Sequence, residues 1–567
     1  MSSGWRINLL LIFFLLLGGL VGYKLFYWQV LKSEELAAAA EKQHWVSFEI
    51  PAKRGDVLAA DGFPLATSEE AFLVFASIPD LKEKPETIAA KIAPLLAEGG
   101  EVAETEQMIK QRLSREDLVW VPLRHKVSRQ AKENLEKLNI SGIGFEEEEK
   151  RNYPEGSASA HLLGFVGADI NGKDKGYFGL EGYYDLELRG QPGFVRREKD
   201  ALGRPILVGE SRQEERVNGK NLLTTIDRPV QLIVEEKLKN GLKRYGAVSG
   251  SVVVMNPKNG AILAMASLPN YDPAYYWKYD KSLFPNPVIA SSYEPGSTFK
   301  VLVMAAAIDS GVVSPETRCD KCSGPRNISG YTIRTWNDKY FPNSTMTEII
   351  QHSDNLGMVF VSEKLGKEKL LAYIKNFGFG KPTGIDLQEE TSPPLRPDGE
   401  WKPIDLATAS FGQGIAVTPL QMVRAVGAIA KKGKLVKPFV VKKIIGEDKE
   451  KEISLPEGIQ VIKASTAAII TEMMVNAVDN GEAKWAKPKG FRIAGKTGTA
   501  QIPVAGHYDE EKTIASFVGF APADEPKFVM LVTLREPTSS PWGSETAAPL
   551  WFDIASELFT YLGILPE

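Results

Sequence analysis

The sequence is poor in the two residue types that build most structural metal sites. Its 567 residues include only two cysteines, Cys319 and Cys322, and five histidines scattered along the chain. A tetrahedral zinc site takes four such ligands, so a single cysteine pair argues against one. We therefore expect no metal and no cofactor. The segment between the cysteines indicates a loop, which a local disulfide could close outside the cytoplasm, with a redox role as the minor alternative.

The chain also lacks an excess of charge of either sign. Its 68 basic and 72 acidic residues give a net charge of −4 at pH 7. Nucleic-acid binding usually relies on a strongly basic surface, so we expect no nucleic acid as a partner. A hydrophobic content of 43% and an aromatic content of 9% suit globular domains rather than disorder. The length is too great for one core and predicts two or three domains.

Charge is nearly absent from one long stretch close to the amino terminus. Ile7 to Trp28 is interrupted only by Lys24, so it is long enough to span a bilayer while this lysine reaches toward the surface. A cleaved signal peptide is the alternative, because the small residues Ala37 to Ala40 could suit a peptidase. The apolar core is longer than that of most signal peptides, so we favour an uncleaved anchor over 7–30 behind a short cytoplasmic tail, 1–6.

A candidate nucleophile occurs in the segment Tyr293 to Lys300, which reads Tyr-Glu-Pro-Gly-Ser-Thr-Phe-Lys. The uncharged residues Val301 to Ile308 follow and predict a buried helix. Residues three apart on a helix share one face, so the Lys300 amine can reach the Ser297 hydroxyl. Burial and a second cation, which Lys496 could supply, would favour the neutral lysine that a base must be.

Two further strings make a chance match to Ser-x-x-Lys hard to accept. Ser353-Asp354-Asn355 follows Ser297 by 56 residues, and Lys496-Thr497-Gly498-Thr499 follows it by 199. Ser-x-x-Lys alone is expected by chance about twice in a chain this long, but all three strings in this order are not. The triple is the signature of penicillin-binding proteins and class A β-lactamases.

The chain resembles the penicilloyl serine transferases, and more specifically the class B penicillin-binding proteins. The resemblance implies an α/β (α+β) fold in which an antiparallel sheet is flanked by helices. It also implies one transmembrane helix and a mostly β pedestal domain of the dimerisation type. We expect the pedestal over 31–220 and the transpeptidase, or penicillin-binding, domain over 221–567.

The local patterns around the two expected domains agree with this resemblance. Arg54-Gly55-Asp56-Val57-Leu58 is similar to the box that opens the family's pedestal, although Ala59-Ala60 replaces the expected Asp-Arg, so the ion pair and turn there need not follow the family. Phe411-Gly412-Gln413-Gly414 is similar to another family string, which we interpret as a structural turn.

The expected transpeptidase domain opens with a strand, a helix capped by Asp227, and a hairpin. Strands and a terminal helix end it, which predicts a sheet with helices packed on its faces. The expected strands are Leu222–Ile226, Gly250–Met255, Ala261–Ala266, Ser516–Phe520 and Phe528–Leu534, and the expected helices are Pro229–Arg244 and Leu550–Leu562.

The resemblance also implies the roles of the catalytic residues. Ser297 is the nucleophile that becomes acylated, and Lys300 is its base. Ser353 relays the proton to the leaving amine. The backbone N–H groups of Ser297 and Thr499 form the oxyanion hole.

The remaining residues of the strings are implied to bind substrate. Asn355 binds a substrate amide, and Lys496 supplies positive potential on an edge strand along which the substrate adds as a further strand. The Thr497 and Thr499 hydroxyls engage the substrate carboxylate, and Gly498 allows close approach to the strand.

The resemblance therefore implies a membrane-anchored peptidoglycan D,D-transpeptidase, single-pass in the cell membrane, with the catalytic domain outside the cytoplasm. Its ligands would be stem peptides and β-lactams, and its partners a polytopic glycosyltransferase and division proteins, with a division-type member favoured. The alternatives are a D,D-carboxypeptidase, a β-lactamase, and a non-catalytic β-lactam sensor or wall-machinery scaffold. A β-lactamase needs neither anchor nor pedestal.

Overall fold

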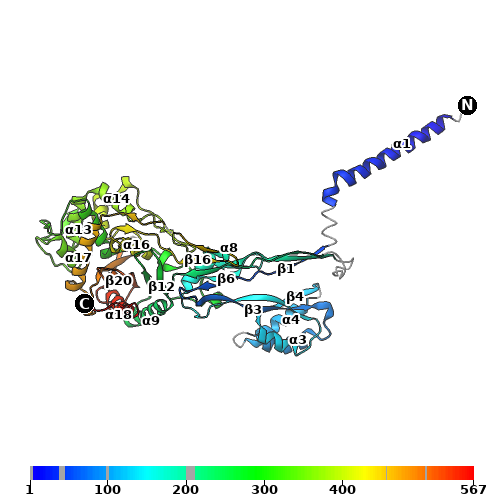
Figure 1. Ribbon diagram of the computed structural model, residues 1–567, viewed down its shortest axis with the longest axis horizontal. Coiled ribbons are helices and arrows are strands. Elements are labelled where there is room, and N and C mark those ends of the chain that lie inside the picture. The colour runs from blue at the N-terminus through cyan, green and yellow to red at the C-terminus, as the bar shows by residue number, and fades with distance from the viewer. Residues whose placement is uncertain are drawn as a thin grey trace. The chain divides into compact units, whose positions relative to one another are not determined.

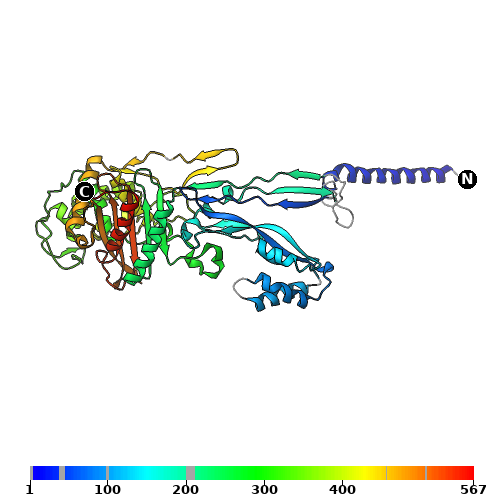
Figure 2. The ribbon, with the colours of Figure 1, turned by 60° about the horizontal axis from the view of Figure 1, so that its bottom comes forward.

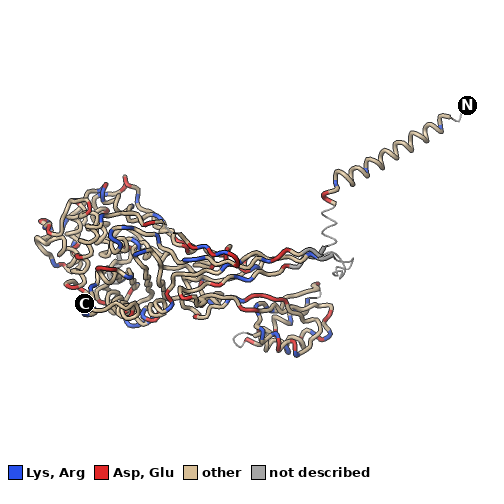
Figure 3. The backbone as a smooth tube through the Cα atoms, viewed as in Figure 1, with Lys and Arg blue, Asp and Glu red and all other residues tan. Residues whose placement is uncertain are grey.

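The computed structural model describes residues 4–36, 45–97, 101–115, 117–198, 211–454, 456–504 and 507–567. Contacts divide the chain into two compact units, namely Met1–Lys53 with Gly190–Gly219, and Arg54–Arg189 with Lys220–Glu567. Outside helix α1, both Lys/Arg and Asp/Glu residues are spread along the backbone (Figure 3).

The first unit contains one long apolar helix and a small sheet. Helix α1 (Gly4–Phe26) continues into the π-helical turn η1 (Tyr27–Leu31), and together they are long and apolar enough to cross a membrane, with a mean hydropathy of 2.3. Figure 3 shows this helix almost free of charge. Ala37 to Ala40, the alternative cleavage region, lie outside the described residues. The sheet is antiparallel, in the order β1-β8-β9, and its strands are Trp45–Ile50, Gly193–Glu198 and Ser211–Glu214.

The second unit is built around a five-stranded antiparallel sheet in the order β12-β11-β21-β20-β19 (Figure 1). The strands are β11 (Ser249–Met255), β12 (Ile262–Leu268), β19 (Ala494–Val504), β20 (His507–Ala521) and β21 (Phe528–Arg535). Along β11, Val252 and Val254 join one core while Val253 and Met255 join the other. Its residues Val252 to Met255 are all apolar, because both faces of the sheet are covered there.

Helices cover the two faces of this sheet, so the predicted fold class is confirmed. Helices α9 (Arg228–Tyr245) and α18 (Ala547–Tyr561) pack on one face (Figure 2). Helix α16 (Pro419–Ala430) packs on the other face. The predicted cap of α9 is present, because the Asp227 carboxylate accepts a hydrogen bond from Val230 N at 3.2 Å.

The other helices of this half surround the catalytic strings. They are α10 (Pro287–Ala290), α11 (Lys300–Asp309), α12 (Met346–Gln351), α13 (Asn355–Leu365), α14 (Lys367–Asn376), α15 (Pro403–Ala409) and α17 (Ala464–Asn480). Short two-stranded sheets pair β13 (Arg326–Ile328) with β14 (Tyr331–Ile333) and β15 (Lys434–Leu435) with β18 (Ile459–Gln460).

A second, seven-stranded sheet joins segments from distant parts of the chain. Its order is β17-β16-β10-β2-β3-β4, with β5 also paired to β3. The strands are β2 (Val57–Leu58), β3 (Pro64–Ser77), β4 (Trp120–Ser128), β5 (Ile143–Asn152), β10 (Asn221–Thr224), β16 (Val441–Ile445) and β17 (Glu450–Glu452). Strand β10 runs parallel to β2, so the chain on either side of residue 220 contributes to one sheet.

Helices pack against this second sheet as well. Helices α3 (Pro85–Leu96), α4 (Val102–Leu113) and α5 (Arg129–Glu136) form a separate small core with β3 and β4. The short elements that follow are α6 (Ala160–Leu163), β6 (Phe165–Ala168), β7 (Asp174–Tyr177), α7 (Gly179–Tyr183) and α8 (Asp185–Arg189).

A buried ion cluster holds the opening box of the pedestal in place. The Arg54 guanidinium lies 2.6 Å from a Glu181 carboxylate oxygen and 2.9 Å from one of Asp185, and Arg151 Nε lies 2.7 Å from the other Glu181 oxygen. The ion-pair partners of Arg54 are therefore Glu181 on α7 and Asp185 on α8. The turn at Ala59 still forms without the expected Asp-Arg, because backbone hydrogen bonds close it.

Candidate active site

Ser297 lies in a tight turn at the start of the predicted buried helix. The 3-10 turn η5 (Gly296–Phe299) leads directly into α11, whose residues from Lys300 to Ala307 are all buried. Gly296 has a positive φ of 55°, and its N–H donates to Gly412 O at 3.0 Å. A Cβ on Gly296 would lie only 2.9 Å from Thr499 O, so the turn is pressed against β19. The Ser297 side chain remains half-buried.

Lys300 lies fully buried beneath this turn. Its side-chain nitrogen hydrogen-bonds Ser353 O at 2.5 Å, Asn355 Oδ1 at 2.7 Å and Ser353 Oγ at 3.3 Å. Burial and the nearby charge of Lys496 lower the pKa of Lys300 well below its ordinary value. Both causes act against the charged form of this lysine.

Ser353 lies in the tight connection between α12 and α13. Its φ of 57° is left-handed, and Asp354 then caps α13 by accepting from Leu356 N at 2.8 Å. This backbone path directs Ser353 and Asn355 toward Lys300. The Asn355 amide is engaged at both ends, because its Nδ2 also donates to Arg334 O at 3.0 Å. One Nδ2 hydrogen remains for a ligand.

The third string lies on β19, which is an edge strand as predicted. The Lys496 ammonium donates to Ser353 Oγ and to Thr497 Oγ1, each at 3.1 Å. Burial lowers the pKa of Lys496 to about 8, although the Glu482 carboxylate acts in the opposite direction. Lys300 and Lys496 therefore both hydrogen-bond the Ser353 hydroxyl.

The other residues of this string are held by close packing. A Cβ on Gly498 would lie 2.4 Å from Ser516 Oγ and 2.8 Å from Thr298 Cγ2, so glycine is needed where β19 meets the Ser297 turn. Thr499 Oγ1 accepts from Gly543 N at 2.9 Å, which leaves its own hydrogen available for a ligand.

A cavity of about 310 Å³ opens above these groups. Six of the eight predicted site residues line it, namely Ser297, Ser353, Asn355, Thr497, Gly498 and Thr499. The two lysines lie below its floor, in contact with Ser353.

The cavity lining that sequence reasoning missed includes Arg334, Trp336, Glu482 and Trp542. The Trp336 and Trp542 rings meet edge to face with centroids 4.8 Å apart. These side chains come from loops outside the three strings, and no local pattern marks them. Only the fold brings them to the site.

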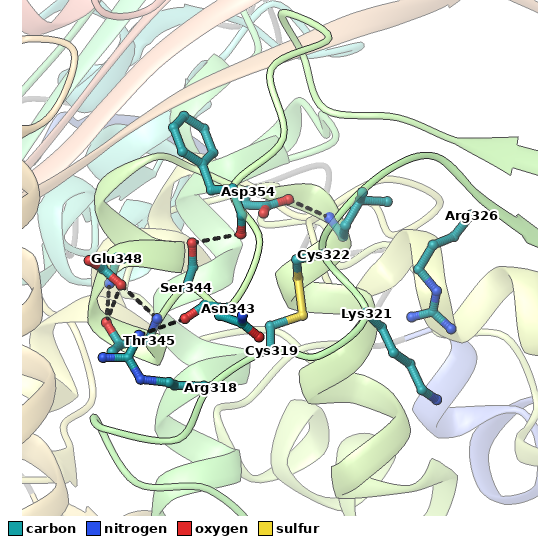
Figure 4. Close-up of a disulfide and its surroundings, with 12 residues drawn as sticks. Arg318, Cys319, Lys321, Cys322, Arg326, Asn343, Ser344, Thr345, Glu348 and Asp354 are labelled. Atoms are coloured by element: carbon teal, nitrogen blue, oxygen red, sulfur yellow. Dashed lines mark hydrogen bonds between the residues drawn. A yellow bond between two sulfur atoms is a disulfide. The ribbon is translucent and has the colours of Figure 1, made fainter.

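The two cysteines form a disulfide in the loop between α11 and β13 (Figure 4). Both are fully buried, and Cys319 N donates to Ser344 O at 2.9 Å. The predicted loop is confirmed, and the pair takes the local disulfide form. It supports the segment leading to Ser353 rather than the cavity itself.

Comparison with known proteins identifies the family. Residues 250–558 match the family described as "Penicillin binding protein transpeptidase domain", and residues 49–224 match "Penicillin-binding Protein dimerisation domain". The chain is 35% identical to stage V sporulation protein D of Bacillus subtilis over 567 residues, which cover 99% of this chain and 86% of the relative. The chain belongs to the class B penicillin-binding proteins. This penicillin-binding protein is also 32% identical to peptidoglycan D,D-transpeptidase FtsI of Escherichia coli over 451 residues, or 79% of this chain and 73% of the relative.

Solved structures of the family share the fold of this penicillin-binding protein. Penicillin binding protein 3 from Mycobacterium tuberculosis, complexed with aztreonam, has a TM-score of 0.70 and 25% identity, covering 92% of this chain and 98% of that one. Penicillin Binding Protein 2X from Streptococcus thermophilus has a TM-score of 0.74 and 25% identity, covering 91% and 80%.

Proposed function

We propose that this penicillin-binding protein is a membrane-anchored peptidoglycan D,D-transpeptidase that works through an acyl-enzyme on Ser297. The observation that carries the proposal is the arrangement at the cavity floor. A half-buried serine precedes a fully buried lysine of lowered pKa, and this lysine shares the Ser353 hydroxyl with Lys496. A neutral amine beside a serine can take its proton during attack.

The first half-reaction forms the acyl-enzyme. Ser297 Oγ attacks the carbonyl carbon of the penultimate D-alanine, and its proton passes to Lys300 Nζ. The N–H groups of Ser297 and Thr499 donate to the oxyanion of the tetrahedral intermediate. As the C–N bond breaks, the leaving amine takes a proton relayed through the Ser353 hydroxyl, and the terminal D-alanine departs.

The second half-reaction makes the crosslink. An amine of a neighbouring stem peptide attacks the ester carbonyl and gives up a proton through the same relay, and the Ser297 oxygen leaves with that proton. A β-lactam would enter the first half-reaction only. Its ring opens when Ser297 attacks, but no fragment leaves to make room for the acceptor, so the acyl-enzyme persists.

Substrate binding follows from the edge position of β19. The free edge offers backbone groups to which an extended stem peptide can add as a strand. We assign the substrate carboxylate to the charge of Lys496 and the hydroxyls of Thr497 and Thr499. The remaining Asn355 Nδ2 hydrogen is assigned to a substrate carbonyl.

Topology and partners belong to the same proposal. Residues 7–30 would anchor the protein as a single pass behind the tail 1–6, with the pedestal (31–220) and transpeptidase domain (221–567) outside the cytoplasm. Crosslinking acts on glycan strands that must be polymerised, so a polytopic glycosyltransferase and division proteins are the proposed partners.

The test uses the full-length protein in detergent with polymerised glycan that carries intact stem peptides. We expect crosslinked peptide dimers and released D-alanine in matching amounts. Release of D-alanine without dimers would indicate a carboxypeptidase. Neither product, from a protein that melts cooperatively, would indicate a sensor or scaffold.

A further inference from the structure

Glu482 is an acidic residue of the cavity wall that the mechanism above does not use. It lies in the turn between α17 and the 3-10 turn η7 (Lys484–Ala486), is half-buried, and lines the same cavity as Ser297 and Ser353. The buried side chains of Lys496 and Lys300 interact electrostatically with this carboxylate, so Glu482 can influence which of the two lysines is protonated.

The turn that carries Glu482 is fastened to the helix end that carries Ser353. Asn476 Nδ2 donates to Gln351 Oε1 at 2.9 Å, and Gln351 Nε2 donates to Asn480 O at 3.5 Å. Gln351 is the last residue of α12, two residues before Ser353. Trp336 lines the same cavity as Glu482 and acts to lower its pKa. The end of α17, from which the Glu482 turn begins, is therefore tied to the end of α12 next to Ser353.

The charged groups that face Glu482 come from three elements. They are Lys496 on β19, Lys300 on α11 and His352 at the end of α12. Burial raises the pKa of Glu482, and the two lysines draw it back toward its ordinary value. Arg334 lines the cavity as well.

The two lysines respond to Glu482 unequally. For Lys496, the Glu482 carboxylate is the charge that opposes burial and favours the protonated form. For Lys300, burial and the Lys496 charge dominate, and Asp354 and then Glu482 oppose them more weakly. Two ammonium groups sharing one hydroxyl repel each other, so only one proton is readily kept there.

We propose that Glu482 is a positioning residue that holds the proton on Lys496 and thereby leaves Lys300 as the neutral amine that accepts the Ser297 proton. This inference rests on the proposed roles of both lysines. Glu482 would act through Lys496 and need not touch the substrate. The two chemically identical side chains then have different protonation states: Lys496 is charged and binds the substrate carboxylate, and Lys300 is neutral and acts as the base.

The test is the pH dependence of the acylation rate by a fluorescent penicillin, measured on the full-length protein in detergent. Glu482→Gln removes the charge with little change in shape. In the wild type, we expect the acylation rate to decline above pH about 8, where Lys496 loses its proton. In Glu482→Gln this decline, the alkaline limb of the pH profile, should begin roughly one pH unit lower, a shift of the size expected from a single nearby charge. The acylation rate at pH 8 should then fall about fivefold and recover as the pH is lowered.

Glu472→Gln is the matched control, because Glu472 lies on α17 but pairs with Arg492 away from the cavity. It should leave the limb in place. Glu482→Ala is a second variant without the charge. The result from whichever of the two variants folds is enough to test the inference. An alkaline limb that stays near pH 8 while the rate falls equally at every pH would overturn the inference. Failure of the wild type to acylate at any pH would instead refute the proposed function.

Discussion

At the scale of single residues, the proposed mechanism gives two lysines opposite tasks. Lys300 is useful as a base only when neutral, and Lys496 attracts a carboxylate only when charged. Both are buried, and both donate to Ser353 Oγ, at 3.3 and 3.1 Å. Pairs of titratable groups whose surroundings separate their pKa values are the usual means of assigning acid and base roles.

The lowered pKa of Lys496 predicts an alkaline limit to acylation. The pKa falls from 10.5 to about 8, so above pH 8 the side chain loses its proton and no longer attracts the carboxylate. We expect the acylation rate of the wild type to decline above this pH. Lys496→Arg, whose guanidinium stays protonated, should acylate more slowly at its optimum but show no decline up to pH 10.

Stopped-flow acylation across pH 6 to 10 measures both curves. If the acylation rate of Lys496→Arg also declines near pH 8, the decline must come from a group other than Lys496. The melting temperature of each variant, followed over the same pH range, separates this effect from unfolding.

At the scale of elements, three segments meet at Ser297. Turn η5 contacts β19, and the segment 411–414 packs behind it. Gly412 has a φ of 80°, and its carbonyl accepts from Gly296 N. The predicted structural turn therefore supports the backbone next to Ser297, the proposed nucleophile, which the sequence string did not reveal.

Gly412→Ala should damage acylation through this support. A Cβ on Gly412 would lie 2.1 Å from Gly296 O, which is backbone and cannot move without displacing Ser297. We expect the acylation rate to fall by at least about tenfold, because small misplacements of a reacting group are costly.

Gly414→Ala is the control for backbone strain. Gly414 also has a positive φ, of 71°, but a Cβ there would meet only Thr408 Oγ1 at 3.3 Å. Both variants should lose about 1 kcal/mol of stability from the left-handed conformation. If both acylate at the wild-type rate, the contact with Gly296 is not needed for catalysis.

At the scale of the whole molecule, the sequence predicted local features and left long-range ones open. The long apolar helix, the strands β11 and β12 and the cap at Asp227 depend on neighbouring residues, so pattern and propensity sufficed. The pairing of β10 with β2, about 165 residues apart, depends on the tertiary fold.

The same distinction applies to the candidate site. The resemblance supplied its eight predicted residues because each lies in a short recognisable string. Glu482, Trp336 and Trp542 reach the cavity from separate loops, so nothing in their own neighbourhoods indicated them.

The buried cluster around Glu181 predicts how distant segments depend on one another. Burial raises the pKa of Glu181, but Arg151 and Arg54 hold it below its ordinary value. Glu181→Gln would leave two buried guanidinium groups short of a partner, at a cost of about 3–5 kcal/mol. We expect a clear fall in melting temperature at pH 7, with residual penicillin labelling at 20 °C.

The pH dependence of stability tests the same cluster. The depressed pKa of Glu181 means that its stabilisation is present above the unfolded pKa, about 4.5, and lost as the pH falls below it. The difference between wild type and Glu181→Gln should therefore shrink in acid. Glu83→Gln, which removes an exposed partner of Lys91, should cost less than about 1 kcal/mol. Equal effects of the two substitutions would contradict this account.

The central claim is that Ser297 becomes acylated, and intact-mass analysis of the full-length protein in detergent after exposure to a fluorescent penicillin tests it most directly. We predict one penicillin adduct per wild-type chain, stable over the experiment, and none on Ser297→Ala of equal melting temperature. An adduct on Ser297→Ala, or a folded wild type that takes up no penicillin, would contradict the account.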